Sequence, residues 1–201
     1  MLTLAHHLSW VTLKMVMSLR YQSIQSNSLS LAQGGQRADY ENETSAGVDA
    51  SIEAKQLLER HPDRLEYGGE IYKYTDADGN IRYGYTVPRV GRAPTPEEYA
   101  RGIRGVFQPN TSAASNPLVP DSAEVVAIYH SHPSSTSFSP ADLNFPKNRD
   151  INIYVGRGGF QGGKLRVKVD GAFWESGNNY NQTPIYDTKK GYVGPFSHFN
   201  N

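Results

Sequence analysis

Hydrophobic residues in the first half of the chain follow a helical spacing and then a strand spacing. Residues 46–60 carry apolar side chains near helical intervals among polar ones, which predicts an amphipathic helix that packs against the core. Residues 66–74 and 81–87 read as two strands, and the acidic segment 76–80 between them contains Asp-Gly, a pair typical of a hairpin turn. The pattern therefore predicts one helix followed by a β-hairpin.

A second apolar run, residues 125–129, predicts a strand that leads directly into His130 and His132. Pro133 removes a ladder donor and so ends this strand. A polar loop follows, and Ser139 before Pro140 predicts the start of a helix, with serine as N-cap and proline in the first turn.

Two further strands are predicted after this helix, at residues 151–155 and 164–169. The glycine-rich segment 156–163 between them lies between two strands and does not open a helix, so we expect a hairpin turn and not a phosphate-binding loop. From residue 171 onward the chain is rich in aromatic residues, which we expect to cover the core.

Residues 88–120 form a long insertion that precedes the histidine strand. The segment is rich in proline, glycine and small polar residues and is locally basic. Loops of this length inside a domain are usually functional or mobile. A flap that binds substrate and a plain excursion of the chain are both open interpretations.

The first twenty residues are apolar only in patches. Lys14 and the pair His6 and His7 interrupt the run before it reaches the roughly 20 residues that a spanning helix requires, so we expect no integral membrane segment. A basic region before the apolar stretch and a small-residue cleavage pattern after it are both missing, so a secretion signal fits poorly. Residues 21–46 are polar and serine-rich and resemble a linker.

Composition narrows the class of protein. The chain has 201 residues, of which 37% are hydrophobic, enough for one core. Twenty basic and twenty acidic residues give a net charge of zero, so we expect no nucleic-acid partner. The chain has no cysteine, which excludes disulfides and cysteine-based zinc fingers.

His130, His132 and Asp142 are the candidate metal ligands. Residues two apart on a strand project from the same face, about 6 to 7 Å apart, so one ion can bind both imidazoles. A helix that starts at Ser139 would bring Asp142 back as a third ligand. Two imidazoles and one carboxylate leave a fourth tetrahedral position for water, which is typical of catalytic zinc. Iron and manganese accept the same ligands.

These residues resemble the signature of the JAMM metalloproteases, also called JAB or MPN+: a glutamate, then His-x-His-Pro, then Ser-x-x-Asp. Here the two later parts are His130 to Pro133 and Ser139 to Asp142. Nine residues separate His132 from Asp142, one fewer than in the deubiquitinating members, which indicates a divergent bacterial branch. The closest resemblance is to uncharacterised JAB-like domains at the carboxyl ends of secreted Rhs-type toxins, which implies an immunity protein as a partner.

The resemblance implies that the upstream glutamate is the general base. Glu66 with Gly69 fits its Glu-x-x-Gly pattern, and Glu70, which has the same strand parity, is the rival. Such a carboxylate takes a proton from metal-bound water and passes it to the leaving amine. The resemblance also gives Ser139 the role of donating a hydrogen bond to the oxyanion. Ser139 and Asp142 can alternatively be explained as a helix capping box alone.

The sequence therefore predicts an α+β fold of the JAB/MPN type, a mixed or antiparallel sheet flanked by helices, with a long insertion before the metal-binding strand. Residues 1–45 are expected to be an extension and linker, and residues 46–201 the metallohydrolase domain. The expected function is zinc-dependent cleavage of an amide or isopeptide bond in a protein or peptide, either in the producer's cytoplasm or as a secreted effector. A protein-binding module with an idle metal site and a metal-dependent nuclease or phosphodiesterase are the alternatives.

Overall fold

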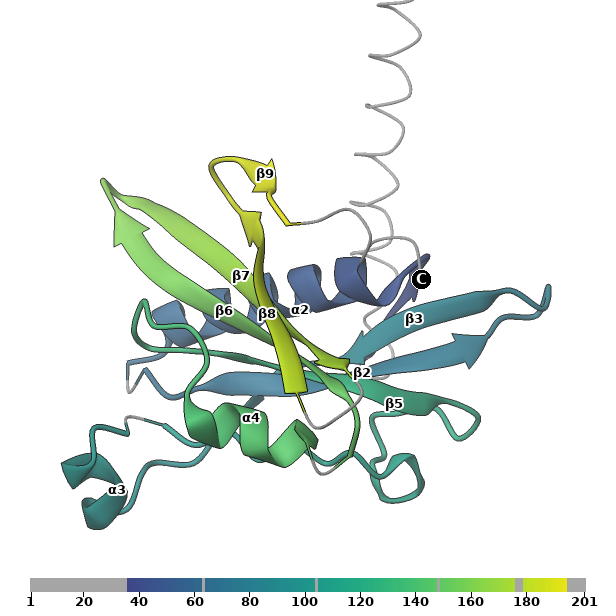
Figure 1. Ribbon diagram of the computed structural model, residues 1–201, viewed down its shortest axis with the longest axis horizontal. Helices are drawn as coiled ribbons and strands as arrows, with labels where there is room; N and C mark the ends of the chain where they lie inside the picture. Colours follow the sequence, from purple (N-terminus) through teal and green to yellow (C-terminus); the bar gives the residue numbers. More distant parts are fainter. Residues whose placement is uncertain (1–35, 63, 104, 148, 176–178, 195–201) are drawn as a thin grey trace, which may run out of the picture.

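The computed structural model describes residues 36–62, 64–103, 105–147, 149–175 and 179–194. These residues form one strongly curled β-sheet with a single long helix against one face (Figure 1). The sheet order is β1-β3-β2-β5-β6-β7-β8-β9, and the short strand β4 pairs with β2 outside that path. All pairings are antiparallel except the one between β5 and β6. The strands are β1 Gln36–Tyr40, β2 Tyr67–Thr75, β3 Ile81–Thr86, β4 Arg89–Val90, β5 Glu124–Ser131, β6 Asn152–Gln161, β7 Lys164–Glu175, β8 Asn179–Asp187 and β9 Gly191–Tyr192.

Helix α2, Glu43–Arg60, covers one face of the sheet. Its N-cap is Asn42, whose side chain accepts the Ser45 backbone N–H at 2.8 Å, so the helix begins three residues before the predicted start. Close packing is possible because Gly47 faces the ring of Tyr154, where a Cβ would come within 2.7 Å of ring atoms. The main core lies between this helix and the sheet.

The predicted α+β fold with helices flanking the sheet is wrong. The described chain is mostly β, a curled half-barrel, and of its three α-helices only α2 spans a face of the sheet. Helix α3, Pro96–Ala100, buries no side chain, and the short helix α4, Pro140–Lys147, packs Leu143 against Ile128 and Ile153 without spanning a face of the sheet.

The difference arises in the second half of the chain, where glycine was read as a turn former. Strand β6 continues through the predicted turn to Gln161, and only Gly162 and Gly163 make the hairpin turn. Gly156 pairs within the sheet, and glycine is required there because a Cβ would come within 2.3 Å of the Ser51 carbonyl of α2. The aromatic tail from residue 171 extends the strand predicted at 164–169 into the longer β7 and also forms β8.

The first hairpin follows the prediction. Strands β2 and β3 pair in antiparallel register, and the turn between them is closed by the Asp76 N–H to the Asn80 carbonyl, with Gly79 at φ 84°. Strand β1, within the segment that resembled a linker, pairs with β3 at the edge of the sheet.

The insertion between β3 and β5 is not a structureless loop. It contains β4, α3, the 3-10 turn Ala113–Ser115 and a bridge between Arg92 and Val106. It lies over the sheet face opposite to α2, on the same side as α4 (Figure 1).

None of the described helices combines the length and the apolar character needed to cross a bilayer. The predictions made for the first twenty residues, and for most of the expected linker, lie outside the described residues.

Candidate metal centre

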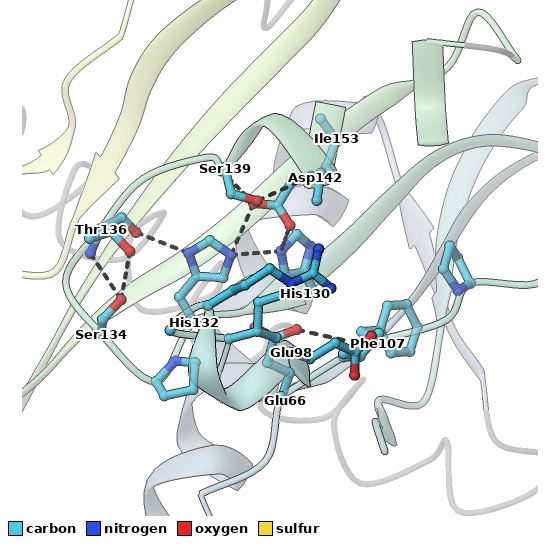
Figure 2. Close-up of a pocket in the computed structure, with 18 of the residues that line it drawn as sticks. Glu66, Glu98, Phe107, His130, His132, Ser134, Thr136, Ser139, Asp142 and Ile153 are labelled. Atoms are coloured by element: carbon cyan, nitrogen blue, oxygen red, sulfur yellow. Dashed lines mark hydrogen bonds and ion pairs between the residues drawn. The ribbon is translucent and has the colours of Figure 1, made fainter. Parts of the chain in front are cut away.

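The structure brings His130, His132 and Asp142 together. The two Nε2 atoms lie 2.9 Å apart, and each lies 3.3 Å from a different oxygen of the Asp142 carboxylate (Figure 2). One ligand atom from each residue falls within 4.8 Å of the others, the spacing of a group that could hold a metal ion. Among the residues that the structure describes, no other group of three or more such side chains meets this spacing.

Two elements place these ligands. His130 lies in β5, paired with Gly68 of β2 and Val155 of β6, and His132 follows directly, with its N–H bonded to the Gly156 carbonyl at 2.9 Å. Both imidazoles are buried, because β5 lies in the middle of the sheet.

The third ligand comes from the first turn of α4. The Ser139 hydroxyl accepts the Asp142 N–H at 3.2 Å, and the Asp142 carboxylate accepts the Ser139 N–H at 2.5 Å. This reciprocal pair is the capping box that was one explanation of these residues. The same carboxylate also lies within 3.3 Å of both histidines, so Asp142 caps the helix and completes the candidate ligand group at the same time.

The spacing of the three donor groups fits a small tetrahedral ion. Two ligand atoms bound at 2.0 to 2.1 Å with tetrahedral angles lie about 3.3 Å apart. Each imidazole Nε2 lies at this separation from one oxygen of the Asp142 carboxylate, a different oxygen for each ring, and the 2.9 Å between the imidazoles is slightly shorter. The donor set therefore needs only a small adjustment to hold such an ion.

The tautomer of His132 also suits a ligand. Its Nδ1 lies 3.1 Å from the Thr136 carbonyl, which can only accept, so Nδ1 carries the proton and Nε2 of the neutral ring presents a lone pair. A backbone acceptor of this kind is the usual partner of a metal-ligating histidine.

The charges at the centre attract one another. Burial alone would raise the pKa of the Asp142 carboxyl, but the neighbouring His130 and His132 hold it well below its usual range. Burial would likewise lower the pKa of His132, and the carboxylates of Asp142 and Glu66 raise it instead. The carboxylate is thus ionised and ready to bind a cation.

Glu66 lies in the same pocket as the three ligands, just before β2 begins (Figure 2). Its Oε2 accepts the Phe107 N–H at 3.3 Å. Burial is the main cause that raises the pKa of Glu66, opposed by the nearby His130 and His132. A carboxylate close to the ligands but outside their hydrogen-bonded group is in the position expected of a base.

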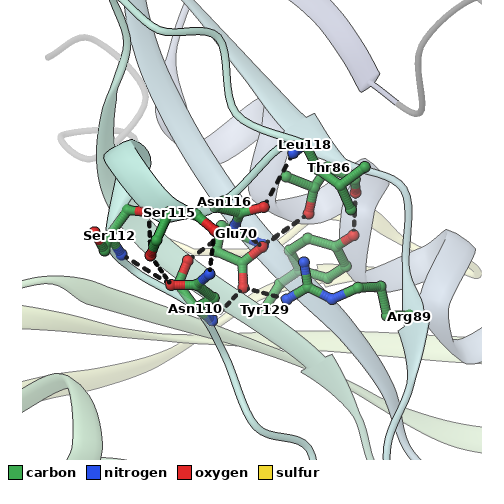
Figure 3. A network of polar contacts seen from close by, with 9 residues as sticks. All are labelled: Glu70, Thr86, Arg89, Asn110, Ser112, Ser115, Asn116, Leu118 and Tyr129. Carbon is green, nitrogen blue, oxygen red and sulfur yellow. Dashed lines mark hydrogen bonds and ion pairs between the residues drawn. The ribbon is translucent and has the colours of Figure 1, made fainter.

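Glu70, the rival base, belongs to a different network (Figure 3). Its side chain is fully buried and pairs with Arg89 at 2.5 Å. The same carboxylate also accepts the Asn110 N–H at 2.7 Å and the Asn116 side-chain amide at 3.0 Å. Glu70 therefore anchors the insertion to β2 and does not line the pocket.

The pocket has a volume of about 470 Å³ and two different walls. The insertion supplies one wall between residues 98 and 109, including Ile103 and Phe107, and the segment from His130 to Asp142 supplies the other. A substrate in this pocket would contact both the insertion and the metal ligands.

Several groups that support this centre were not predicted from the sequence. The Thr136 carbonyl and the Phe107 N–H are backbone groups, so no residue type could have indicated them. Lys55 donates to the His132 carbonyl at 2.7 Å. The sequence offered one indication that this lysine is buried, namely its position three residues before Leu58 on the apolar face of α2.

Comparison with protein-family models, with curated proteins and with solved structures finds no match to this chain.

Proposed function

We propose that this protein is a zinc-dependent peptidase or isopeptidase of the JAMM type, which cleaves an amide bond in a protein or peptide substrate. The observation that carries the proposal is the convergence of two histidines and one aspartate in a pocket that also holds Glu66. Zinc suits two imidazoles and one carboxylate with a fourth position left for water.

The expected chemistry divides between the ion and the chain. A bound zinc ion would lower the pKa of water from near 16 to about 7. Glu66 then accepts the proton of the attacking water and delivers it to the leaving nitrogen. The burial that raises the pKa of this carboxyl improves it as a proton carrier at neutral pH.

Ser139 is suited to stabilise the oxyanion. Its hydroxyl lines the pocket and uses a lone pair to accept the Asp142 N–H, so its own proton remains available to a substrate oxygen. The capping bond fixes the position of this hydroxyl relative to the ligand on the same helical turn. Ser139 would thus both cap the helix and donate a hydrogen bond in the proposed reaction.

A single small metal group also favours amide hydrolysis over phosphodiester cleavage. Enzymes that cut phosphodiesters often use two ions about 3.5 to 4 Å apart, held by several carboxylates. Within the described part of the chain, the group of His130, His132 and Asp142 has no neighbouring second set of ligands.

The test combines metal content with turnover. The zinc-loaded protein is offered a pool of internally quenched peptides and a set of lysine ε-linked isopeptides. Glu66→Gln should keep about one zinc per chain and lose about 100-fold or more in turnover, because proton transfer by a positioned side chain contributes 10² to 10⁴.

Glu70→Gln is the matched control, assayed well below its unfolding temperature. It removes the same charge four residues further along the chain, within β2 and outside the pocket, and should keep most of the turnover. Full turnover by Glu66→Gln, or cleavage that needs no metal, would contradict the proposed function.

A further inference from the structure

His132, a proposed metal ligand, is the last residue before an irregular loop. Strand β5 ends at Ser131, and the loop from Pro133 to Phe138 has no regular backbone pairing of its own. A ligand at such a place keeps its position only if the surrounding chain holds it. The structure shows three cationic side chains that donate hydrogen bonds here, one to the His132 carbonyl and two to carbonyls of the loop.

Lys55 of α2 makes the first contact. Its Nζ donates to the His132 carbonyl at 2.7 Å, and its side chain is fully buried. Glu59, one turn later on the helix, balances the charge at 2.8 Å. Burying a lysine is costly, and an apolar residue would suit this face of the helix better. The buried ammonium thus lies where it donates to the backbone carbonyl of a proposed metal ligand.

The next two contacts follow along the loop. Arg64 donates to the Pro133 carbonyl and Arg157 to the Ser135 carbonyl, each at 3.3 Å. Arg157 is itself held in place by two bonds to the buried Asp170, at 2.5 and 3.1 Å.

The fourth contact returns to the ligand. The Thr136 carbonyl, next after Ser135, is the acceptor of His132 Nδ1. The backbone here is thus tied to α2 at His132 and to β6 and β7 at Ser135, and the acceptor that fixes the His132 tautomer is the residue directly after the second tie.

We infer that Lys55 and Arg157 are positioning residues for the metal: they hold the His132 backbone and the Thr136 carbonyl so that the His132 Nε2 faces His130 and Asp142. This inference rests on the proposed function, because it concerns the same metal centre. Neither residue lines the pocket, so neither contacts substrate. Each is paired with a carboxylate, so the two add little net positive charge near a bound cation.

Zinc affinity tests this inference without any substrate. Lys55→Met keeps the apolar stem and removes the ammonium, and it should weaken zinc binding by about 10- to 100-fold, the range found for partners of metal ligands. Lys73→Met is the control, because Lys73 of β2 also pairs with a glutamate, Glu124 at 2.9 Å, which lies at the end of β5 opposite to His130. It should bind zinc with the affinity of the wild type, because it changes no hydrogen-bond partner of a proposed ligand.

Arg157→Lys gives a second, milder test that does not depend on how well Lys55→Met folds. Lysine keeps a cation beside Asp170 but has no second arm for the Ser135 carbonyl. We expect a smaller but measurable loss of zinc affinity, together with a nitrogen NMR spectrum of the metal-free protein in which the His132 ring no longer holds a single tautomer.

The outcomes separate the two proposals. Wild-type affinity and an unchanged His132 tautomer in folded Arg157→Lys and Lys55→Met would overturn the positioning role and leave the proposed function intact. A wild-type protein that binds no zinc would overturn both. An equal loss of zinc affinity in Lys73→Met would show that Lys55→Met acts through general destabilisation, and it would overturn the inference.

Discussion

Glu66 and Glu70, the two candidate general bases, should differ in their contributions to the free energy of unfolding. This difference can be measured without a substrate. Both oxygens of the Glu70 carboxylate accept hydrogen bonds. One accepts from Arg89 and Asn110, and the other accepts from Thr86 and Asn116. In Glu70→Gln, the new NH₂ group therefore faces donors at whichever of the two positions it takes. The change therefore places two donors against each other at a fully buried position.

The expected cost follows from the contacts. Removing one partner of a buried ion pair costs 3 to 5 kcal/mol. The Arg89 side chain is 32% exposed and can turn partly to water, so we expect the low end, about 3 kcal/mol. For a protein of this size the melting temperature should fall by about 6 to 12 °C.

Chemical denaturation and thermal unfolding of three variants measure this difference. Glu66→Gln removes a carboxylate whose charged form burial disfavours, so it should leave stability unchanged or slightly higher. Glu124→Gln removes an exposed ion pair and should cost less than about 1 kcal/mol. The reasoning is refuted if Glu70→Gln unfolds within 1 kcal/mol of the wild type (less than the smallest cost expected for a buried pair), or if Glu66→Gln is the more damaging change.

Three further predictions concern the rest of the fold. Gly156→Ala should destabilise the protein by about 1 to 3 kcal/mol in urea unfolding, because its Cβ would meet the Ser51 carbonyl; an unchanged midpoint would contradict the close approach of α2. Burial raises the pKa of Glu43, so its contribution to stability is fully present below the unfolded pKa of about 4.5 and is lost as pH rises through the folded value; Glu43→Gln should flatten this part of the stability curve, and an identical curve would count against the burial effect. Limited proteolysis should cut at exposed Arg101 before it cuts within residues 106–118, which Glu70 and its partners hold; the reverse order, read by mass spectrometry, would show that this half of the insertion is not anchored.

The candidate centre could be predicted from the sequence because its rules are local. Alternation along a strand places His130 and His132 on one face, and the serine before Pro140 starts the helix that returns Asp142. The first hairpin was predicted for the same reason, since Asp-Gly chemistry acts within a few residues.

The parts that failed depend on contacts distant in the chain. Gly156 was read as part of a turn. It lies in β6, and glycine is needed there because the backbone of α2, about a hundred residues earlier in the chain, leaves no room for a side chain. The choice between Glu66 and Glu70 was open because both share one strand parity, and only the folded insertion separates them by offering Glu70 its partners. The α+β class was wrong because the aromatic tail extends β7 beyond the predicted strand and adds β8, and this pairing depends on partners that periodicity does not reveal.

The most direct test of the central claim is the metal content of the purified protein. After exchange into metal-free buffer without chelator, elemental analysis should find about one zinc per chain in the wild type, since three protein ligands hold a catalytic ion. His132→Ala and Asp142→Ala should each lose most of it, and Ser139→Ala should lose less, because the serine caps the helix but is not a ligand. A wild type without zinc, or variants that keep it in full, would contradict the metal centre described here.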